Sequence, residues 1–179
     1  MGLISLGMIG RMVAERLKTF DVNVIAYDPY VSAEDGATLG VERVLLAEVF
    51  ARADVVSLHT PWLPETVGMI TGEHIAAMKP GATFINTARG AVVREPEMIA
   101  ALQQRPDLYA ILDVTYPEPP EPGSALYTLP NVVLTPHIAG SMFEECRRMG
   151  QYIIDELKRY LAGEPLRWAV SRERAKIMA

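Results

Sequence analysis

Three residues that lie far apart in the chain, Arg89, Glu118 and His137, are of the types that the reduction of a 2-oxo acid requires. A guanidinium binds a carboxylate through two parallel hydrogen bonds and polarises the neighbouring carbonyl. An imidazolium gives a proton to the developing alkoxide, and a carboxylate on its other ring nitrogen fixes the tautomer and favours the protonated form. The three residue types together predict proton and hydride exchange at a small acid.

A second group of residues predicts the hydride carrier. In the opening MGLISLGMIGRMVAERL, a short apolar run precedes Ser5, Gly7 and Gly10, which lead into an amphipathic helix. Such a turn presents backbone N–H groups to a pyrophosphate, although the G-x-G-x-x-G fingerprint has glycine where Ser5 stands. Asp28 follows Gly10 by 18 residues, where an acid binds ribose hydroxyls and repels the extra phosphate of NADP. These residues favour NAD as the cofactor.

Each of these residues also has a structural interpretation. The opening turn could need small residues for packing, with Asp28 as a cap. Taken singly, Arg89 beside a glycine turn, Glu118 in a proline-rich loop and His137 at a strand end are more typical of solvated or hydrogen-bonded surface residues. Their common position favours chemistry, because ligands of open α/β sheets bind at the carboxyl ends of strands and all three follow such ends.

The elements that would position these residues alternate along the chain. Apolar runs predict six strands, several of them buried on both faces, at 3–5, 23–27, 54–59, 82–87, 109–114 and 131–135. Periodicity predicts helices at 9–20, 47–52, 72–79 and 95–104. This alternation predicts a doubly wound, Rossmann-type α/β fold with a parallel sheet. On the first helix, the residues expected to share one apolar face are Ile9, Met12, Val13, Leu17 and Phe20.

The C-terminal part follows a different pattern. Apolar residues recur at spacings of three and four from Met142 to Tyr160 and predict a long helix within 141–162, which stops at Gly163 and Pro165. The tail 166–179 is too short to form a domain. We therefore predict a single domain with a long C-terminal helix, divided into a cofactor-binding unit at 1–140 and a helix and tail at 141–179.

Composition narrows the possible functions. The chain has 179 residues, half of them apolar, with a formal net charge of -5 and no cluster of Lys and Arg, which argues against nucleic-acid or anionic-membrane partners. No apolar run is long enough to span a bilayer, and the start lacks the features of a signal peptide. Cys146 is the only cysteine, so no intramolecular disulfide can form. A cytoplasmic enzyme or binding module fits these features.

The sequence gives little support for a metal site or for a catalytic nucleophile. His59, His74 and His137 have no ligand-like spacing, there is no cysteine pair, and no G-x-S-x-G elbow is present. His59 follows a strand and could line a cofactor cleft, but a structural role fits it equally well. No metal is therefore predicted.

Six motifs in order, GLISLGMIG, AYDPY, LHTPWLPET, MKPGATFINTARGAVV, ILDVTYPEPP and LTPHIAG, resemble the D-isomer-specific 2-hydroxyacid dehydrogenases over nearly the whole chain. The resemblance implies that Arg89, Glu118 and His137 are the catalytic residues, with hydride passing between NAD and C2 of a small 2-hydroxy or 2-oxo acid. It also implies a homodimer. The implied NAD site comprises Ser5, Gly7, Met8, Ile9, Gly10, Asp28, Thr60, Pro61, Thr87, Ala88, Asp113, His137, Ala139 and Gly140.

Three residues depart from, or discriminate within, that family pattern. Ser5 replaces the first glycine, which changes little if its backbone φ is negative. Arg94 stands where the family often has an acid, and the sequence offers no interpretation of it. Glu118 argues against formate dehydrogenase, a relative that has glutamine at this place.

The largest departure is the lobe that family members carry before the glycine turn. This chain starts at the first strand of the NAD domain and so resembles a fragment, whose helix at 141–162 and tail would run towards that lobe. The apolar face of the tail is expected to be exposed, swapped onto a neighbour or disordered. Two alternatives to an active enzyme remain: a module that binds NAD without turnover, and a structural protein with a vestigial Rossmann fold.

Overall fold

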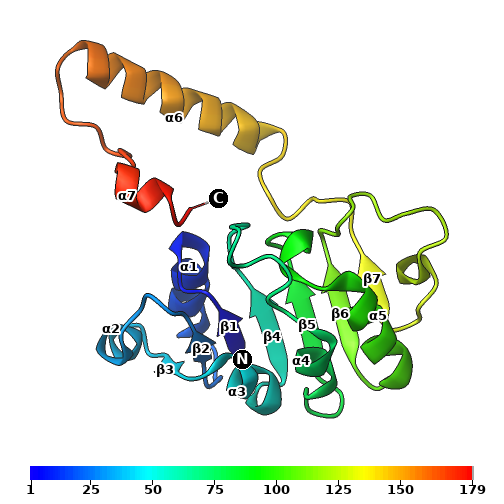
Figure 1. Cartoon of the computed structure of the whole chain (residues 1–179). Helices are drawn as coiled ribbons and strands as arrows, with labels where there is room; N and C mark the ends of the chain where they lie inside the picture. The colour runs from blue at the N-terminus through cyan, green and yellow to red at the C-terminus, as the bar shows by residue number, and fades with distance from the viewer. Residues whose placement is uncertain (179) are drawn as a thin grey trace.

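The computed structural model describes residues 1–178 and is built on a seven-stranded sheet (Figure 1). All neighbouring strands pair in parallel, in the order β3-β2-β1-β4-β5-β6-β7, which confirms the predicted doubly wound fold. The strand order reverses between β1 and β4, the switch point at which such sheets bind ligands. The strands are β1 (Gly2–Ile4), β2 (Ile25–Tyr27), β3 (Glu42–Arg43), β4 (Val55–Leu58), β5 (Thr83–Asn86), β6 (Tyr109–Leu112) and β7 (Val132–Leu134).

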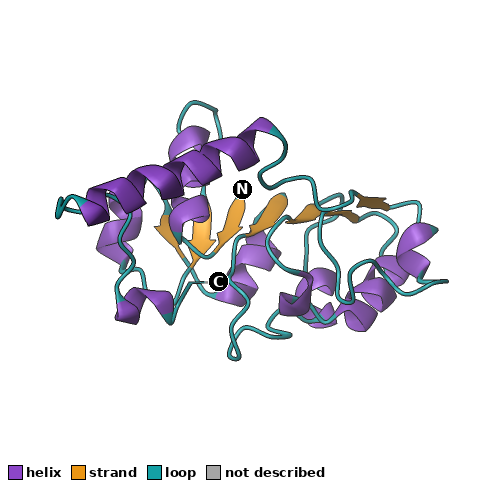
Figure 2. Ribbon diagram, turned by 90° about the horizontal axis from the view of Figure 1, so that it is seen from above, coloured by secondary structure: helices purple, strands orange, loops and turns teal. Residues whose placement is uncertain are grey.

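Helices lie on both sides of the sheet (Figure 2). α3, α4 and α5 follow one another along one face, whereas α1 packs beside β1 with a separate, smaller core. The helices are α1 (Met8–Leu17), α2 (Ala33–Thr38), α3 (Leu46–Arg52), α4 (Gly72–Ala76), α5 (Glu95–Gln104), α6 (Glu144–Leu161) and α7 (Arg172–Ala175), with 3-10 turns η1 (Gly90–Val92) and η2 (Ala125–Tyr127).

The main core lies between the sheet and α3, α4 and α5. Phe50 of α3, Ile75 of α4 and Leu102 of α5 are buried against Leu58 and Phe84 of the central strands. Each side chain of this size contributes roughly 1.5–3 kcal/mol when removed from water. This core makes the central strands a rigid base for the loops at their carboxyl ends.

All six predicted strands and the five predicted helices, the long C-terminal one included, are present, with ends that shift by a few residues. β3, α2 and α7 were not expected. β3 has only two residues, and α2, with the sequence AEDGAT, lacks an apolar stripe that periodicity could detect. Its N-terminus is set instead by Ser32, whose hydroxyl accepts a hydrogen bond from the N–H of Asp35.

The predicted apolar face of α1 is wrong in part. Ile9, Met12 and Phe20 are exposed, and the buried residues of the helix are Gly10 and Ala14. The reason is close approach, because a Cβ on Gly10 would lie 2.1 Å from a backbone oxygen of the turn that precedes the helix. The helix therefore packs through its smallest residues. Val13 and Leu17, the other two residues of the expected face, are half-buried beside the smaller core.

Burial on both faces does not hold for the last two strands. Tyr109 and Ile111 of β6 and Val133 of β7 are exposed, whereas alternate residues of β6 are buried. Right-handed crossovers from β4 to β6 place α4 and α5 on the same face of the sheet. The opposite face of β6 and β7 carries the exposed side chains.

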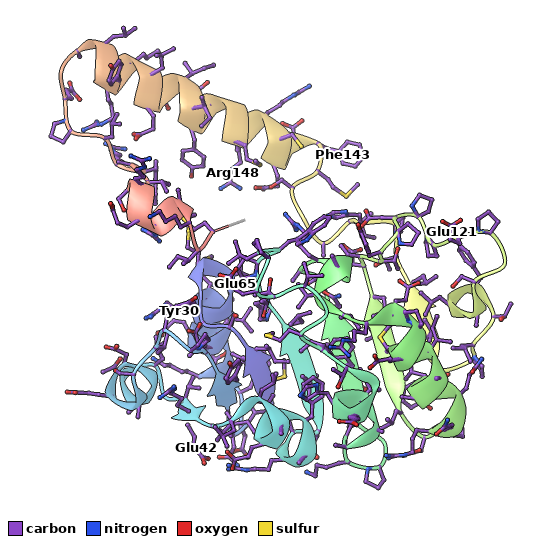
Figure 3. The ribbon with its side chains drawn as sticks, viewed as in Figure 1. Tyr30, Glu42, Glu65, Glu121, Phe143 and Arg148 are labelled. Atoms are coloured by element: carbon purple, nitrogen blue, oxygen red, sulfur yellow. The ribbon has the colours of Figure 1, made fainter. Side chains whose placement is uncertain are left out.

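The C-terminal helix stands apart from the sheet. Figure 1 shows α6 separated from the body, and Figure 3 labels Phe143 and Arg148 near its first turn. None of its residues is buried. The tail after it has exposed apolar side chains, among them Leu166, Trp168 and Val170, although Trp168 also contacts Tyr152 of α6. The chain then turns back through α7 towards α1, and Ala179 lies outside the described residues.

Candidate functional site

Two cavities lie at the carboxyl edge of the sheet, next to the switch point. The larger has a volume of about 490 Å³ and the smaller about 320 Å³. Loops after β1 and β4 line both, the loop after β2 lines the larger, and the loop after β5 lines the smaller. The residues common to the two cavities are Gly7, Met8, Thr60, Pro61 and Ile177. The cavities therefore meet above the opening glycine turn.

The glycine turn leaves an uncovered helix N-terminus beside these cavities. Gly7 is the N-cap of α1, no side chain caps it, and the first turn of the helix contains no acid. A Cβ built on Gly7 would meet no atom within 4 Å, so the space beside it is open. The first N–H groups of a helix have no partner within the helix and carry its positive dipole end. The predicted residues Met8, Ile9 and Gly10 thus fit a pyrophosphate.

Ser5 does not have the negative φ with which the change from glycine would matter little. Its φ is +74°, in the left-handed region that favours glycine, because the chain must leave β1 and enter α1 within three residues. A residue with a Cβ costs roughly 1–2 kcal/mol there. Ser5 Oγ lies 3.1 Å from Thr60 Oγ1, a hydrogen bond that joins the loops after β1 and β4.

Asp28 lies at the end of β2 and lines the larger cavity. Only 6% of it is exposed, and its two carboxylate oxygens accept hydrogen bonds from the N–H of Leu6, at 2.7 Å, and of Tyr30, at 2.8 Å. These bonds agree with a capping role. Each carboxylate oxygen accepts more than one hydrogen bond, so the same group retains capacity for a ribose hydroxyl.

Other residues of the larger cavity were not predicted as site residues. Figure 3 labels Tyr30 and Glu65, which line it from the loops after β2 and β4. Both lie within motifs quoted for the family resemblance, so the motifs carried a usable signal. Arg174 and Ile177 of the tail also line this cavity. No local sequence pattern predicts their position, because they come from a distant part of the chain.

Glu118 and His137 form a direct contact. A carboxylate oxygen of Glu118 lies 2.6 Å from Nδ1 of His137, although the loops that carry them follow different strands. The side chains are 41% and 47% exposed. Among residues 1–178, no side chain or backbone group makes a hydrogen bond to the other ring nitrogen, Nε2. The pair can therefore orient an imidazole whose second nitrogen faces outward.

Asp113 holds the turn that carries His137. It is 3% exposed and accepts hydrogen bonds from the N–H groups of Ile138, at 2.9 Å, and Ala139, at 2.8 Å. Burial alone would raise its pKa, but the Thr135 hydroxyl and these two N–H groups outweigh burial and lower the pKa below the ordinary value of 3.8. Beyond this turn, a Cβ on Gly140 would meet no atom within 4 Å.

Arg89 follows β5 and lines the smaller cavity with Thr87 and Ala88. Asn86 fixes this segment, because its side chain donates to the carbonyl of Arg89, at 3.1 Å, and accepts from the N–H of Ala88, at 3.0 Å. The Arg89 guanidinium donates to the carbonyl of Ala88 at 2.6 Å. The other N–H groups of the guanidinium can donate two parallel hydrogen bonds to a carboxylate.

The structure brings two of the three predicted catalytic residues into contact and leaves the third apart. Glu118 and His137 line a further cavity of about 430 Å³, whereas Arg89 lines the smaller of the first two. Within residues 1–178, no hydrogen bond or ion pair joins Arg89 to the other two.

His59 also lines the smaller cavity. Burial lowers the pKa of its imidazole, so the neutral form is favoured there. Its Nε2 lies 3.1 Å from the hydroxyl of Ser57, a structural hydrogen bond. His59 therefore lines this cavity and also makes a structural hydrogen bond.

Residues 1–178 contain neither a metal-binding cluster of side chains nor a membrane-spanning helix. No group of three or more His, Cys, Asp and Glu side chains has an arrangement that could hold a metal ion. None of the helices in this range has both the length and the apolar character needed to cross a membrane.

Comparison with known proteins identifies relatives over most of the chain. D-3-phosphoglycerate dehydrogenase of Archaeoglobus fulgidus is 39% identical over 170 residues, which are 95% of this chain and 32% of that protein. The NAD complex of a D-isomer specific 2-hydroxyacid dehydrogenase from Lactobacillus delbrueckii ssp. bulgaricus has a TM-score of 0.81 and 34% identity, covering 95% of this chain and 55% of that one. An enzyme of the same description from Xanthobacter autotrophicus, solved with NADPH and MES, has a TM-score of 0.80 and 33% identity, covering 97% and 71%.

The chain spans about a third of the length of the phosphoglycerate dehydrogenase that it matches. The family model for the D-isomer specific 2-hydroxyacid dehydrogenase NAD binding domain matches residues 1–139. This range includes the whole sheet and the loops after β1, β2, β4 and β5 that line the two cavities. The chain therefore belongs to the D-isomer specific 2-hydroxyacid dehydrogenases and contains their NAD-binding domain.

Proposed function

We propose that the chain binds NAD(H) and contributes to hydride transfer between this cofactor and C2 of a small 2-hydroxy or 2-oxo acid. The observation that carries the proposal is the contact of Glu118 with His137 at the sheet edge where the glycine turn also lies. A histidine held by a carboxylate, with its second ring nitrogen free, is suited to acid–base chemistry. When bound, the nicotinamide ring would supply or accept the hydride.

The cofactor would be held by the residues that the sequence predicted. The backbone of Gly7, Met8, Ile9 and Gly10 suits the pyrophosphate, and Asp28 would bind the adenosine ribose and disfavour the 2′-phosphate of NADP. Ser5 would shape the turn. The remaining predicted residues, towards the nicotinamide, are Thr60, Pro61, Thr87, Ala88, Asp113, Ala139 and Gly140.

The reacting acid would be held and protonated by three side chains. The Arg89 guanidinium would bind its carboxylate and polarise the C2 carbonyl, which requires Arg89 to turn its free donors towards the His137 side of the edge. His137 would give a proton from Nε2 to the C2 oxygen during reduction and take it back during oxidation. Glu118, hydrogen-bonded to Nδ1, would keep the ring in the required orientation and tautomer.

The proposed organisation assigns residues 1–140 to the cofactor domain and 141–179 to a helix and tail that pack against other parts of a longer dehydrogenase. None of the α6 residues is buried, which supports this assignment, since a helix with apolar residues on its surface normally packs on a partner. We also propose a homodimer and a cytoplasmic location, where the lone Cys146 would stay reduced.

A second candidate is a module that binds NAD without turnover. The observation that favours it is the exposure of the catalytic pair, because Glu118 and His137 are open to water in this chain. Water weakens the electrostatic stabilisation of the transition state and loosens orientation. Under this alternative the cofactor affinity would survive and the reaction would not.

An assay of the purified chain distinguishes the two candidates. NADH is mixed with a panel of small 2-oxo acids and its consumption is followed by absorbance, for the wild type and for Arg89→Met and His137→Gln. Turnover by the wild type that both variants lose supports the dehydrogenase. NADH binding without consumption supports the module, and consumption that the variants leave unchanged contradicts the assigned roles.

A further inference from the structure

The sequence offered no interpretation of Arg94. Its contacts in the folded chain indicate a role. It is the N-cap of α5, and its guanidinium Nε donates to the carbonyl of Gly68 at 3.0 Å. The stem of the side chain covers Gly68, since a Cβ there would lie 3.2 Å from Arg94 Cγ. The other arm of the guanidinium lies 3.2 Å from Glu97 Oε1. Arg94 therefore joins the start of α5 to the loop after β4.

Backbone hydrogen bonds join the same two segments. The N–H of Gly68 donates to the carbonyl of Ala91 at 2.9 Å, and the N–H of Ile70 donates to the carbonyl of Val92 at 3.0 Å. The N–H of Arg94 donates to the carbonyl of Ile70 at 2.8 Å, next to an isolated parallel bridge. Residues 68–70 are thus fastened along residues 91–94, and the Arg94 side chain reaches back to the first of them, Gly68.

The two fastened segments lead directly to the two cavities. Residues 60–69 supply Pro61, Leu63, Thr66 and Met69 to the wall of the larger cavity. The segment before η1 supplies Thr87, Ala88 and Arg89 to the smaller one. Neither wall is a helix or a strand, so its position depends on such cross-links. Arg94 itself lines neither cavity.

We propose that Arg94 is a positioning residue of the dinucleotide site: by holding Gly68 it fixes the loop after β4 relative to the Arg89 segment. The inference rests on the proposed function, since it concerns the same cofactor cleft. It predicts that loss of Arg94 weakens NADH binding even though the side chain does not touch the cofactor. An acid at this position cannot donate to a carbonyl, so the cross-link depends on a basic side chain.

Arg105 provides the matched control. It is the C-cap of the same helix, and its guanidinium donates to the carbonyls of Ala76, at 2.7 Å, and Met78, at 3.3 Å, and pairs with Asp107. Its loss removes hydrogen bonds to two backbone carbonyls at the opposite end of α5, against the one that Arg94 makes. If cofactor affinity merely followed stability, Arg94→Met and Arg105→Met would have the same effect.

The experiment measures the melting temperature, the NADH dissociation constant and hydrogen exchange at the amides of Gly68 and Ile70. Arg94→Met is expected to raise the dissociation constant about tenfold, with partial rescue by Arg94→Lys, while Arg105→Met changes it less than about twofold at a similar melting temperature. Exchange at the two amides should accelerate only in Arg94→Met. An unchanged dissociation constant in Arg94→Met, or an equal rise in Arg105→Met, overturns the inference.

The exchange measurement separates this inference from the proposed function. If the wild type fails to bind NADH, the proposed function fails, and exchange at Gly68 and Ile70 still decides whether Arg94 holds the loop. Faster exchange in Arg94→Met than in Arg105→Met then supports the positioning role. Equal exchange in the two variants overturns it.

Discussion

The carboxylate of Glu118 lies 2.6 Å from Nδ1 of His137 and thereby specifies which ring nitrogen faces outward. In the neutral imidazole, a proton on Nδ1 donated to Glu118 leaves the lone pair on Nε2. A chain of this length can be studied by NMR without turnover, so the geometry can be tested independently of catalysis.

For Glu118→Gln we predict a loss of this tautomer preference. An amide accepts a hydrogen bond more weakly than a carboxylate and also presents a competing donor. Nitrogen-15 shifts of the His137 ring should show the Nδ1–H tautomer in the wild type and a mixture in the variant. Predominance of the Nε2–H tautomer in the wild type contradicts the assigned orientation.

For Asp28→Ala we predict two separable losses. The N–H groups of Leu6 and Tyr30 lose their buried acceptor, which should lower the free energy of unfolding by about 1–3 kcal/mol. NADH affinity should also fall by about tenfold, while NADPH affinity changes less or improves, because the repulsion of the 2′-phosphate is removed. Calorimetric titration with both cofactors measures the ratio. A parallel loss for both would assign Asp28 a capping role only.

Ser5 tests the left-handed turn. Ser5→Ala loses the hydrogen bond to Thr60 and keeps the backbone strain, whereas Ser5→Gly loses the bond and relieves the strain. The glycine variant should therefore be more stable than the alanine variant by about 1–2 kcal/mol, a difference of several degrees in melting temperature. Equal stabilities would contradict a φ of +74° at this position.

Gly90 tests the packing behind Arg89. A Cβ there would lie 2.1 Å from the backbone of Thr115, which cannot move aside without shifting the loop after β6. Gly90→Ala should destabilise the fold by several kcal/mol, with ~3 kcal/mol as the expected scale of overpacking. Gly150→Ala in α6 is the control, because nothing lies within 4 Å and helix propensity favours alanine by about 1 kcal/mol. Thermal denaturation of the two variants compares them directly.

The lowered pKa of Asp113 leads us to predict that the stability of the fold depends on pH. Its folded-state pKa lies below the ordinary 3.8, so its ionised form stabilises the fold above that value, and the contribution disappears as the pH falls through the folded-state pKa. Asp113→Asn should be less stable than the wild type at neutral pH, with the difference shrinking as the solution is acidified. Denaturant unfolding over this range measures it. A difference that is constant down to acid pH would contradict the lowered pKa.

The sequence allowed the sheet to be predicted because parallel strands read as short apolar runs between helical patterns. It also allowed Glu118 and His137 to be paired in one site, since both follow strands whose ends share one edge of the sheet. These inferences depend on local periodicity and on the fixed geometry of a doubly wound sheet.

The sequence did not predict features that depend on the close approach of two backbone segments or on contacts between distant parts of the chain. The burial of Gly10 in place of Ile9 follows from the distance between α1 and the preceding turn, which no periodicity encodes. The left-handed φ of Ser5 follows from the three-residue connection between β1 and α1, which the residue type does not indicate. The contact of Arg94 with Gly68 joins residues 26 positions apart and becomes visible only in the folded chain.

If this chain forms a working dinucleotide site, the purified protein binds NADH in a titration without any other component. Nicotinamide fluorescence is followed for NADH and, in parallel, for NADPH. We expect saturable binding of NADH that is clearly tighter than that of NADPH. The absence of binding to both cofactors, by a chain shown to be folded, would contradict it.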